Sequence, residues 1–479
     1  MRRRNFRTFA AAALLSASPT LAVGFTAAKI AVRTAGSAER WEVDLGGRLV
    51  AALAPRAPDS GDLLLLVTPD GEPDAPRRLL RIGGGPSPSV AIVAGSVEGW
   101  VKALAAFDPG HGPELLAGGI GRLASFGPLE SPSLASRDLI VHPGFDLRSL
   151  APSRLRVGVL RDVAAAEVGV LRVWASDGHD KLALEAELHL PFAAKSDASG
   201  LELDGVPVVE LPPDGDGRRR FAAGPEPVGT RLRVVVATHE ADGWKSAEAW
   251  ASLPGPEEVE ESWLGTIDGA PGLVVHTQGA VAVDAFERQR WRAFRLAADV
   301  TRSGHGPGLA VTVDSKRWQD ADAELVDVDG DGHDDVVVAR AEGMTGGDLV
   351  VEVYRGLGGG AFAPDPRRTD VGDPPRRFEL LRDADGRGRP GIVGLYRDRV
   401  VLWRLASAGG RALEHAPLVD APLPELPPRP KPPVEGAFHR TRREWLGIVP
   451  RRGSPPALLV VETSEIGNER LIVVRSGSR

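Results

Sequence analysis

The chain has 479 residues, of which 42% are hydrophobic, and it contains 57 glycines, 40 prolines and no cysteine. This length and hydrophobic content can bury a sizeable core, whereas the lack of cysteine excludes disulfides, thiolate metal sites and a cysteine nucleophile. The formal net charge of −7 argues against a nucleic-acid partner, which requires a basic face.

The N-terminus has the residue order of a cleaved signal peptide. Arginines at positions 2, 3, 4 and 7 precede the apolar stretch 9–15, and small residues suited to cleavage follow. We therefore predict that residues 1–28 are a signal peptide and that the protein is exported, to the periplasm or out of the cell. The pair Arg3-Arg4 also resembles a twin-arginine signal, so Sec and twin-arginine export both stay open. No later stretch reaches about 18 uncharged apolar residues, so we expect no membrane span in the mature chain.

Glycine and proline interrupt the remaining sequence every 8–15 residues or so, which favours many short strands joined by turns. The sequence thus predicts an all-β fold. Residues 29–149 contain strand-like runs at 49–53, 62–67, 101–107 and 114–117, which we assign to the first small sheets. Residues 150–255 also contain strand-like runs but keep no period. They are interpreted either as divergent sheets of the same kind or as an inserted β-sandwich.

Residues 256–479 contain a repeated unit of an apolar strand, a turn rich in Asp, Gly and Pro, and a second apolar strand. The second strands open at residues 272, 335, 391 and 457, which are 63, 56 and 66 positions apart. A third strand is expected at 280–286, 348–355, 399–405 and 469–475. A period near 60 residues with three or four strands per unit is typical of the blades of a β-propeller, where stacked neighbours bury the faces that one small sheet cannot.

The repeat predicts a β-propeller of about seven blades, with six and eight left open by residues 150–255. The C-terminal unit has only three strand candidates, and residues 30–32 or 41–45 could supply its fourth. We therefore expect the N- and C-terminal strands to pair and close the ring, which would remove an exposed sheet edge.

One turn of the repeat has the spacing of a calcium-binding loop. Residues 327–335 read Asp-Val-Asp-Gly-Asp-Gly-His-Asp-Asp, so that Asp327, Asp329 and Asp331 occupy alternate positions. Calcium takes six to eight oxygen ligands, and alternate carboxylates on a glycine-containing turn can point to one centre. The carbonyl of His333 and the carboxylate of Asp335 would add two further ligands at the same spacing.

The residues around this loop distinguish it from an EF-hand. The twelfth position is Val338, where an EF-hand needs a bidentate glutamate, and the run after Asp335 favours a strand. Residues 324–364, with the glycine-rich turn and the Phe-Ala-Pro tail of 356–364, resemble the FG-GAP/VCBS repeat of integrin-type β-propellers and of exported bacterial proteins. The resemblance implies that Asp327, Asp329, Asp331 and Asp335 hold a calcium ion with a structural role.

The corresponding turn of the next unit keeps two of the carboxylates, Asp383 and Asp385, but has Arg387 and Gly391 where two further ligands are needed. We predict that this turn binds no calcium and that an arginine cation substitutes for the metal.

No catalytic motif stands out in the sequence. The ten histidines form no His-Glu-x-x-His pattern, no Gly-x-Ser-x-Gly motif occurs, and the ten tryptophans lie mostly beside apolar strands, where a core role is expected. We therefore predict a non-catalytic binding or scaffold module with a protein or glycan ligand. The alternatives are a propeller-based carbohydrate-active enzyme, a lyase or a hydrolase, and a purely structural envelope protein.

Overall fold

The structure is a computed structural model of the chain. It describes residues 30–35, 38–54, 63–68, 76–83, 89–97, 101, 103–107, 114–119, 122–128, 137–141, 155–157, 159–160, 162–167, 169–176, 182–192, 208–253, 258–278, 288–296, 309–314, 321–341, 348–425, 442–451, 454–463 and 469–476. The regular elements in these ranges are all β-strands, which confirms the all-β prediction. Within the same ranges no helix is long and apolar enough to cross a membrane. The expected signal peptide, residues 1–28, lies outside them.

The described strands form eight sheets of three or more strands, which we number along the chain. Sheet 1 contains β3 (Arg48–Ala54), β4 (Leu63–Thr68), β5 (Arg77–Gly83) and β6 (Ser89–Val97), and sheet 2 contains β7 (Ala103–Phe107), β8 (Glu114–Gly119), β9 (Arg122–Pro128) and β10 (Arg137–Val141). Sheet 3 contains β13 (Asp162–Glu167), β14 (Val170–Ser176) and β15 (Leu182–His189), and sheet 4 contains β16 (Val208–Leu211), β17 (Arg220–Val228), β18 (Arg231–Glu240) and β19 (Gly243–Ser252).

The second half of the chain forms the other four sheets. Sheet 5 contains β20 (Glu258–Ile267), β21 (Ala270–Gln278), β22 (Arg288–Arg295) and β23 (Leu309–Asp314), and sheet 6 contains β24 (Ala321–Val326), β25 (Asp335–Ala341), β26 (Leu349–Tyr354) and β29 (Arg367–Asp370). Sheet 7 contains β30 (Arg377–Leu381), β31 (Gly391–Leu395), β32 (Arg399–Arg404) and β33 (Val419–Pro422), and a small hairpin, β27 (Gly356–Gly358) with β28 (Ala361–Phe362), follows β26. Sheet 8 contains β1 (Ile30–Ala35), β2 (Ala38–Asp44), β34 (Arg442–Arg451), β35 (Ser454–Thr463) and β36 (Glu469–Ser476).

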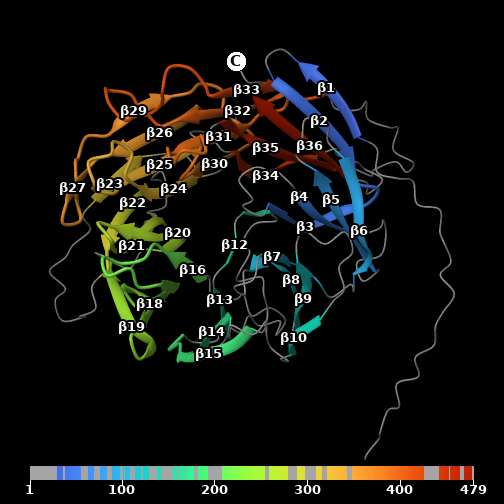
Figure 1. Ribbon diagram of the computed structural model, residues 1–479. Coiled ribbons are helices and arrows are strands. Elements are labelled where there is room, and N and C mark those ends of the chain that lie inside the picture. Colours follow the sequence, from blue (N-terminus) through green and yellow to red (C-terminus); the bar gives the residue numbers. More distant parts are fainter. Residues whose placement is uncertain are drawn as a thin grey trace, which may run out of the picture.

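The sheets lie around a common centre (Figure 1), and most neighbouring sheets contact each other through the first strand of each, with β34 in this position in sheet 8. These contacts run from β3 to β7, from β13 through β16, β20, β24 and β30 to β34, and from β34 to β11 beside β3. The apolar clusters each combine side chains of two neighbouring sheets, as where Val274 and Trp291 of sheet 5 pack with Leu325 and Val336 of sheet 6. Neighbours thus cover both faces of a middle strand, which explains why every residue of β25 is buried.

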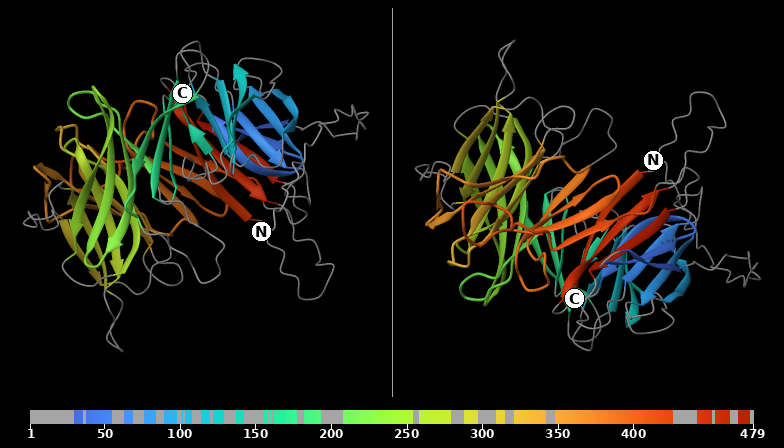
Figure 2. Two further views of the ribbon diagram at one scale, coloured as in Figure 1. Left: turned by 90° about the horizontal axis from the view of Figure 1, so that it is seen from below. Right: turned by 90° about the horizontal axis from the view of Figure 1, so that it is seen from above.

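The two ends of the chain share sheet 8. β2 pairs antiparallel with β36, with Trp41 opposite Val473, and β1 adds a further strand outside β2. Figure 2 shows these blue N-terminal strands beside the red C-terminal ones. The expectation that the terminal strands pair is therefore confirmed.

Two sequence-based expectations changed in detail. The preferred count of seven units is not confirmed, because the described residues form eight sheets, the upper end of the range left open. The third strands of sheets 6, 7 and 8 lie where they were expected, whereas the third strand of sheet 5 is β22; the expected strand 280–286 falls outside the described residues.

Residues 150–255 contain sheets 3 and 4 together with two very short strands. β11 (Leu155–Val157) pairs in parallel with β3, and β12 (Val159–Leu160) pairs in parallel with β7. This segment therefore adds one strand to sheet 1 and one strand to sheet 2. The strands with which they pair lie about a hundred positions or fewer earlier in the chain.

Candidate metal centre

The acidic loop of sheet 6 connects its first two strands. Val326, the last residue of β24, lies opposite Asp335, the first residue of β25, so residues 327–334 form the turn between them. Val328 points into the core and is 7% exposed, which fixes the start of the turn. Gly330 and Gly332 have φ values of 80° and 87°, a backbone region that glycine adopts without strain.

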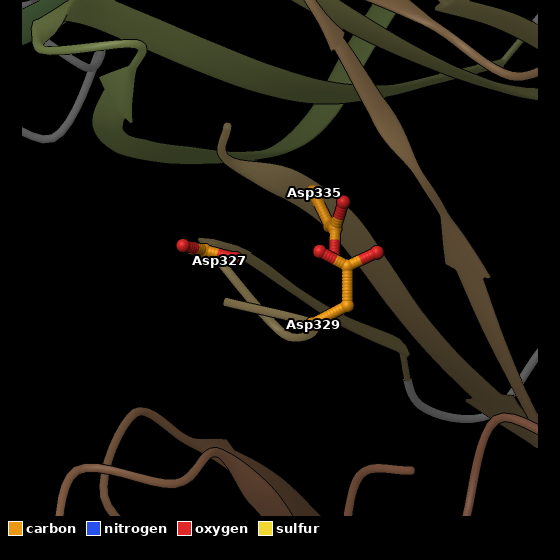
Figure 3. Close-up of side chains that lie close together, drawn as sticks. All are labelled: Asp327, Asp329 and Asp335. Atoms are coloured by element: carbon orange, nitrogen blue, oxygen red, sulfur yellow. The ribbon is translucent and has the colours of Figure 1, made fainter. Parts of the chain in front are cut away.

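The turn brings three carboxylates together. One oxygen from each of Asp327, Asp329 and Asp335 lies within 4.8 Å of the others. Figure 3 shows the carboxylates of Asp329 and Asp335 next to each other, with Asp327 to one side. Calcium lies 2.3–2.6 Å from each ligand oxygen, so oxygens on opposite sides of the ion are about 5 Å apart. The spacing therefore fits a calcium ion.

Backbone N–H groups hold all three carboxylates in place, and Asp329 accepts one such bond, from Asp331 N at 3.2 Å. Asp335 accepts hydrogen bonds from Val328 N at 3.1 Å and from Gly356 N at 2.7 Å. Asp327 accepts from Gly330 N at 2.7 Å and from Gly332 N at 3.0 Å. A carboxylate oxygen has two lone pairs, so each of these oxygens can also face a metal.

Burial makes the charge on Asp335 costly. Desolvation raises the pKa of this carboxyl to about 6, and the neighbouring charge of Asp329 acts in the same direction, although the two backbone hydrogen bonds oppose the shift. A cation at the centre of the three carboxylates would remove this cost. The donor set is made of oxygen alone, which suits a hard cation such as calcium.

Asp331, the fourth carboxylate expected at the site, is placed differently from the other three. Its Oδ2 lies 2.7 Å from Nη2 of Arg355, and its Oδ1 accepts a hydrogen bond from His333 N at 2.9 Å. These two contacts, the backbone bond first, lower the pKa of Asp331. Arg355 also reaches Asp329, with Nε 3.0 Å from Oδ2. Asp331 thus faces a guanidinium and stands outside the group of three.

The side chain of His333 points to the neighbouring sheet. Its Nδ1 lies 3.2 Å from Oδ1 of Asp268, in the turn between β20 and β21. Asp268 also donates its backbone N–H to Oδ2 of Asp334 at 2.8 Å and accepts from Gly360 N at 3.3 Å. The loop of sheet 6 is therefore joined to the turn of sheet 5.

Sequence reasoning missed both Asp268 and Arg355 as partners of this loop. Asp268 carried a usable signal in the sequence, since it occupies the first position of the corresponding turn in sheet 5. In the structure it has a positive φ of 50°, which few residues other than glycine adopt. Arg355 carried none, because nothing in a strand-ending arginine indicates which loop it contacts.

Arginine cations lie beside the corresponding turn of sheet 7. Asp385 is 6% exposed and has Nε of Arg389 at 3.8 Å and Nη1 of Arg404 at 3.7 Å from its Oδ2. The backbone N–H of Arg387 donates to Oδ1 of Asp385 at 2.9 Å. The positive charge shown at this turn is supplied by Arg389 and Arg404, which the sequence analysis did not name, whereas Arg387, the arginine that it named, contacts Asp385 through its backbone N–H.

Comparisons with known proteins give no family. No family model matches the chain, and no curated protein matches it. Among solved structures the chain is similar to a polysaccharide lyase, Uly1, with 8% identity and a TM-score of 0.41 over 91% of this chain and 98% of that one. It is also similar to AofleA from Arthrobotrys oligospora, with 13% identity and a TM-score of 0.27 over 70% of this chain and 91% of that one. At these TM-scores the likeness carries no conclusion about function.

Proposed function

We propose that this chain is an exported, calcium-stabilised β-propeller of the FG-GAP/VCBS type that serves as a non-catalytic binding or scaffold module. The observation that carries the proposal is the convergence of Asp327, Asp329 and Asp335 at the turn between the first two strands of sheet 6. The arrangement of eight small sheets around one centre supports the propeller, here with eight blades.

Asp327, Asp329 and Asp335 are the side chains that would hold the calcium ion. Calcium would neutralise their mutual repulsion and fix the turn. Asp335 is central because it starts β25 and also binds the backbone of Val328 and of Gly356. A carboxylate kept charged at this point holds the acidic loop and the glycine-rich hairpin β27–β28 together.

The neighbouring turn of sheet 5 belongs to the same surface. Asp268 connects this turn to the acidic loop through His333 and to the glycine-rich hairpin through Gly360. Three backbone turns are thereby joined by polar contacts into one surface. A rigid surface of this kind suits recognition of a protein or a glycan, since little conformational entropy is lost on binding.

Thermal unfolding tests the calcium part of the proposal. After removal of metal with EDTA, added calcium is expected to raise the melting temperature, and Asp329→Ala is expected to abolish the difference. Weak affinity, on the order of 10⁻⁴–10⁻³ M as in extracellular modules, means that millimolar calcium is needed. Identical melting of the wild-type chain with and without calcium would contradict a structural role. Glycan-array and protein-capture experiments in calcium then test the binding role.

A second candidate, a carbohydrate-active enzyme, is favoured by a polar cluster between sheets 3 and 4. Nε2 of His239 lies 3.1 Å from Oε1 of Glu185, and Nη2 of Arg219 lies 3.9 Å from the same oxygen. An imidazole oriented by a carboxylate beside a guanidinium can combine a general base with an anion-stabilising group. However, Glu185 also accepts from Nε1 of Trp244 at 2.8 Å, which ties β15 to β19, and so we prefer a structural role.

Incubation of the protein with neutral and acidic polysaccharides separates the two candidates. An enzyme would produce new reducing ends or unsaturated sugars, and His239→Gln would remove that activity while the protein stays folded. No product with any polysaccharide is the outcome expected of a binding module.

A further inference from the structure

Arg355 occupies an unusual position between two members of the acidic loop. It follows β26 directly, and its side chain is 55% exposed. Its guanidinium places Nε 3.0 Å from Oδ2 of Asp329 and Nη2 2.7 Å from Oδ2 of Asp331. Asp329 therefore belongs both to the three-carboxylate group and to an ion pair with Arg355.

The backbone keeps Arg355 beside the loop. The next residue, Gly356, donates its N–H to Oδ1 of Asp335 at 2.7 Å, and Ala363 N donates to the carbonyl of Arg355 at 2.8 Å. A Cβ at position 356 would lie 2.4 Å from the carbonyl oxygen of Asp334, so glycine is what allows this close approach. The backbone of Arg355 is thereby held at a place from which its side chain reaches Asp329 and Asp331.

Other acidic turns of the chain have guanidinium partners too. In the turn between β16 and β17, Nε of Arg218 lies 2.7 Å from Asp214 and its Nη2 lies 3.1 Å from Asp216. In sheet 7, Arg389 and Arg404 lie beside Asp385. An internal arginine is therefore a recurrent way in which this chain balances the charge of its acidic turns. The loop of sheet 6 differs because one oxygen from each of Asp327, Asp329 and Asp335 lies within 4.8 Å of the others.

We infer that Arg355 is an internal counter-cation of the acidic loop, which competes with calcium for Asp329 and thereby lowers the calcium affinity of the site. The inference rests on the proposed calcium function. A divalent ion held by Asp329 would stand close to the guanidinium, and two positive charges at such a distance repel each other. When calcium is absent, Arg355 offsets the repulsion between Asp329 and Asp331. Calcium binding then has to displace this cation.

Calorimetric titration of calcium into the metal-stripped full-length chain tests the inference with three variants. Arg355→Gln removes the competing charge and is expected to bind calcium about tenfold more tightly than the wild type. Arg355→Lys keeps a positive charge and is expected to stay within about threefold of the wild type. Arg218→Gln removes the guanidinium from an acidic turn that has only Asp214 and Asp216, so it is the matched control and should leave calcium binding unchanged.

Thermal unfolding in EDTA gives a second readout. Without calcium, Arg355→Gln is expected to melt below the wild type, because the loop has lost its counter-cation, and calcium is expected to raise its melting temperature by more than that of the wild type. This result also shows that the variant folds.

The outcomes separate the inference from the function on which it rests. If the wild type binds calcium and Arg355→Gln binds it no more tightly, or if Arg355→Lys gains as much affinity as Arg355→Gln, the inference is wrong and the calcium site stands. If neither the wild type nor Arg355→Gln binds calcium, the loop is no metal site and both are overturned. Binding by Arg355→Gln alone would support the inference in its strongest form.

Discussion

Nη1 of Arg470, on the last strand β36, lies 2.6 Å from Oε2 of Glu42, on β2 near the start of the chain. The same guanidinium reaches Glu462 on β35, and Glu462 in turn accepts from Nε of Arg443 on β34 at 3.0 Å. Alternating charges thus cross four strands of sheet 8, in addition to the main-chain pairing of β2 with β36. The two carboxylates are buried, so their charge depends on these partners.

Replacement of Arg470 by alanine is expected to lower the free energy of unfolding by about 2–3 kcal/mol, because Glu42 and Glu462 remain buried with one cation fewer. Urea denaturation measures the change. The control is Asp420→Ala, which removes an exposed pair with Arg399 at 3.7 Å and should cost less than about 0.5 kcal/mol. Equal losses of unfolding free energy in the two variants would show that the buried charges of sheet 8 stabilise the fold no more than an exposed ion pair does.

A second prediction concerns pH and Asp322. This carboxylate accepts from Nε1 of Trp263 in sheet 5 at 2.9 Å and from Leu380 N in sheet 7 at 2.7 Å, so it connects three sheets. Burial, with smaller contributions from the charges of Glu324 and Glu379, raises its pKa to about 7. The folded state therefore holds the proton more tightly than the unfolded state. The resulting stability is complete below the unfolded pKa near 4 and is lost as pH rises through about 7.

Asp322→Asn removes this titration, so the stability difference between pH 5 and pH 8 should shrink by at most about 2–3 kcal/mol, because pH 5 lies two units below the folded pKa of about 7. Urea denaturation at the two pH values measures it, with Asp370→Asn, an exposed carboxylate, as control. An unchanged pH dependence in Asp322→Asn would mean that this group does not titrate in the folded protein as described.

The junction of sheets 5 and 6 depends on Asp268. Asp268→Ala loses the contacts with His333 and Gly360 while the backbone still needs a positive φ, and a loss of about 1–3 kcal/mol is expected. Asp268→Asn keeps an acceptor and tolerates this φ, so its effect should be smaller. Hydrogen exchange of the turns that contain Asp268 and Gly360 measures both. Greater exchange in Asp268→Asn than in Asp268→Ala would contradict this assignment.

Gly356 gives a steric prediction. Gly356→Ala would place Cβ 2.4 Å from the backbone carbonyl of Asp334, and the necessary backbone shift should cost about 1–3 kcal/mol. Gly410→Ala is the control, since nothing lies within 4 Å of a Cβ there and its φ needs no glycine. Denaturation curves compare the two, and similar stability of both variants would contradict the close approach of Gly356, the first residue of β27, to the acidic loop.

The parts of the fold that the sequence predicted are those encoded by local patterns. The apolar runs on either side of residues 327–334 became β24 and β25, and the alternation of Asp327, Asp329 and Asp335 brought three carboxylates to one place. These features depend on residues close together in the chain, so strand period and turn chemistry were sufficient for them, whereas Asp331, expected from the same alternation, faces Arg355 instead.

The parts that the sequence did not predict depend on contacts between distant residues. Arg355 contacts the loop 24 positions before it, and Asp268 contacts it from 65 positions away in another sheet. The number of sheets was uncertain because residues 150–255 keep no period, and two very short strands in this segment, residues 155–157 and 159–160, pair with β3 and β7 of earlier sheets. No periodicity in residues 150–255 indicates such partners.

The calcium content of the purified protein at equilibrium tests directly whether Asp327, Asp329 and Asp335 hold a calcium ion. After treatment with EDTA and dialysis against millimolar calcium, the wild-type chain is expected to hold one calcium ion that Asp329→Ala does not hold. Equal calcium in the two proteins, or none in the wild type, would contradict a calcium site at Asp327, Asp329 and Asp335.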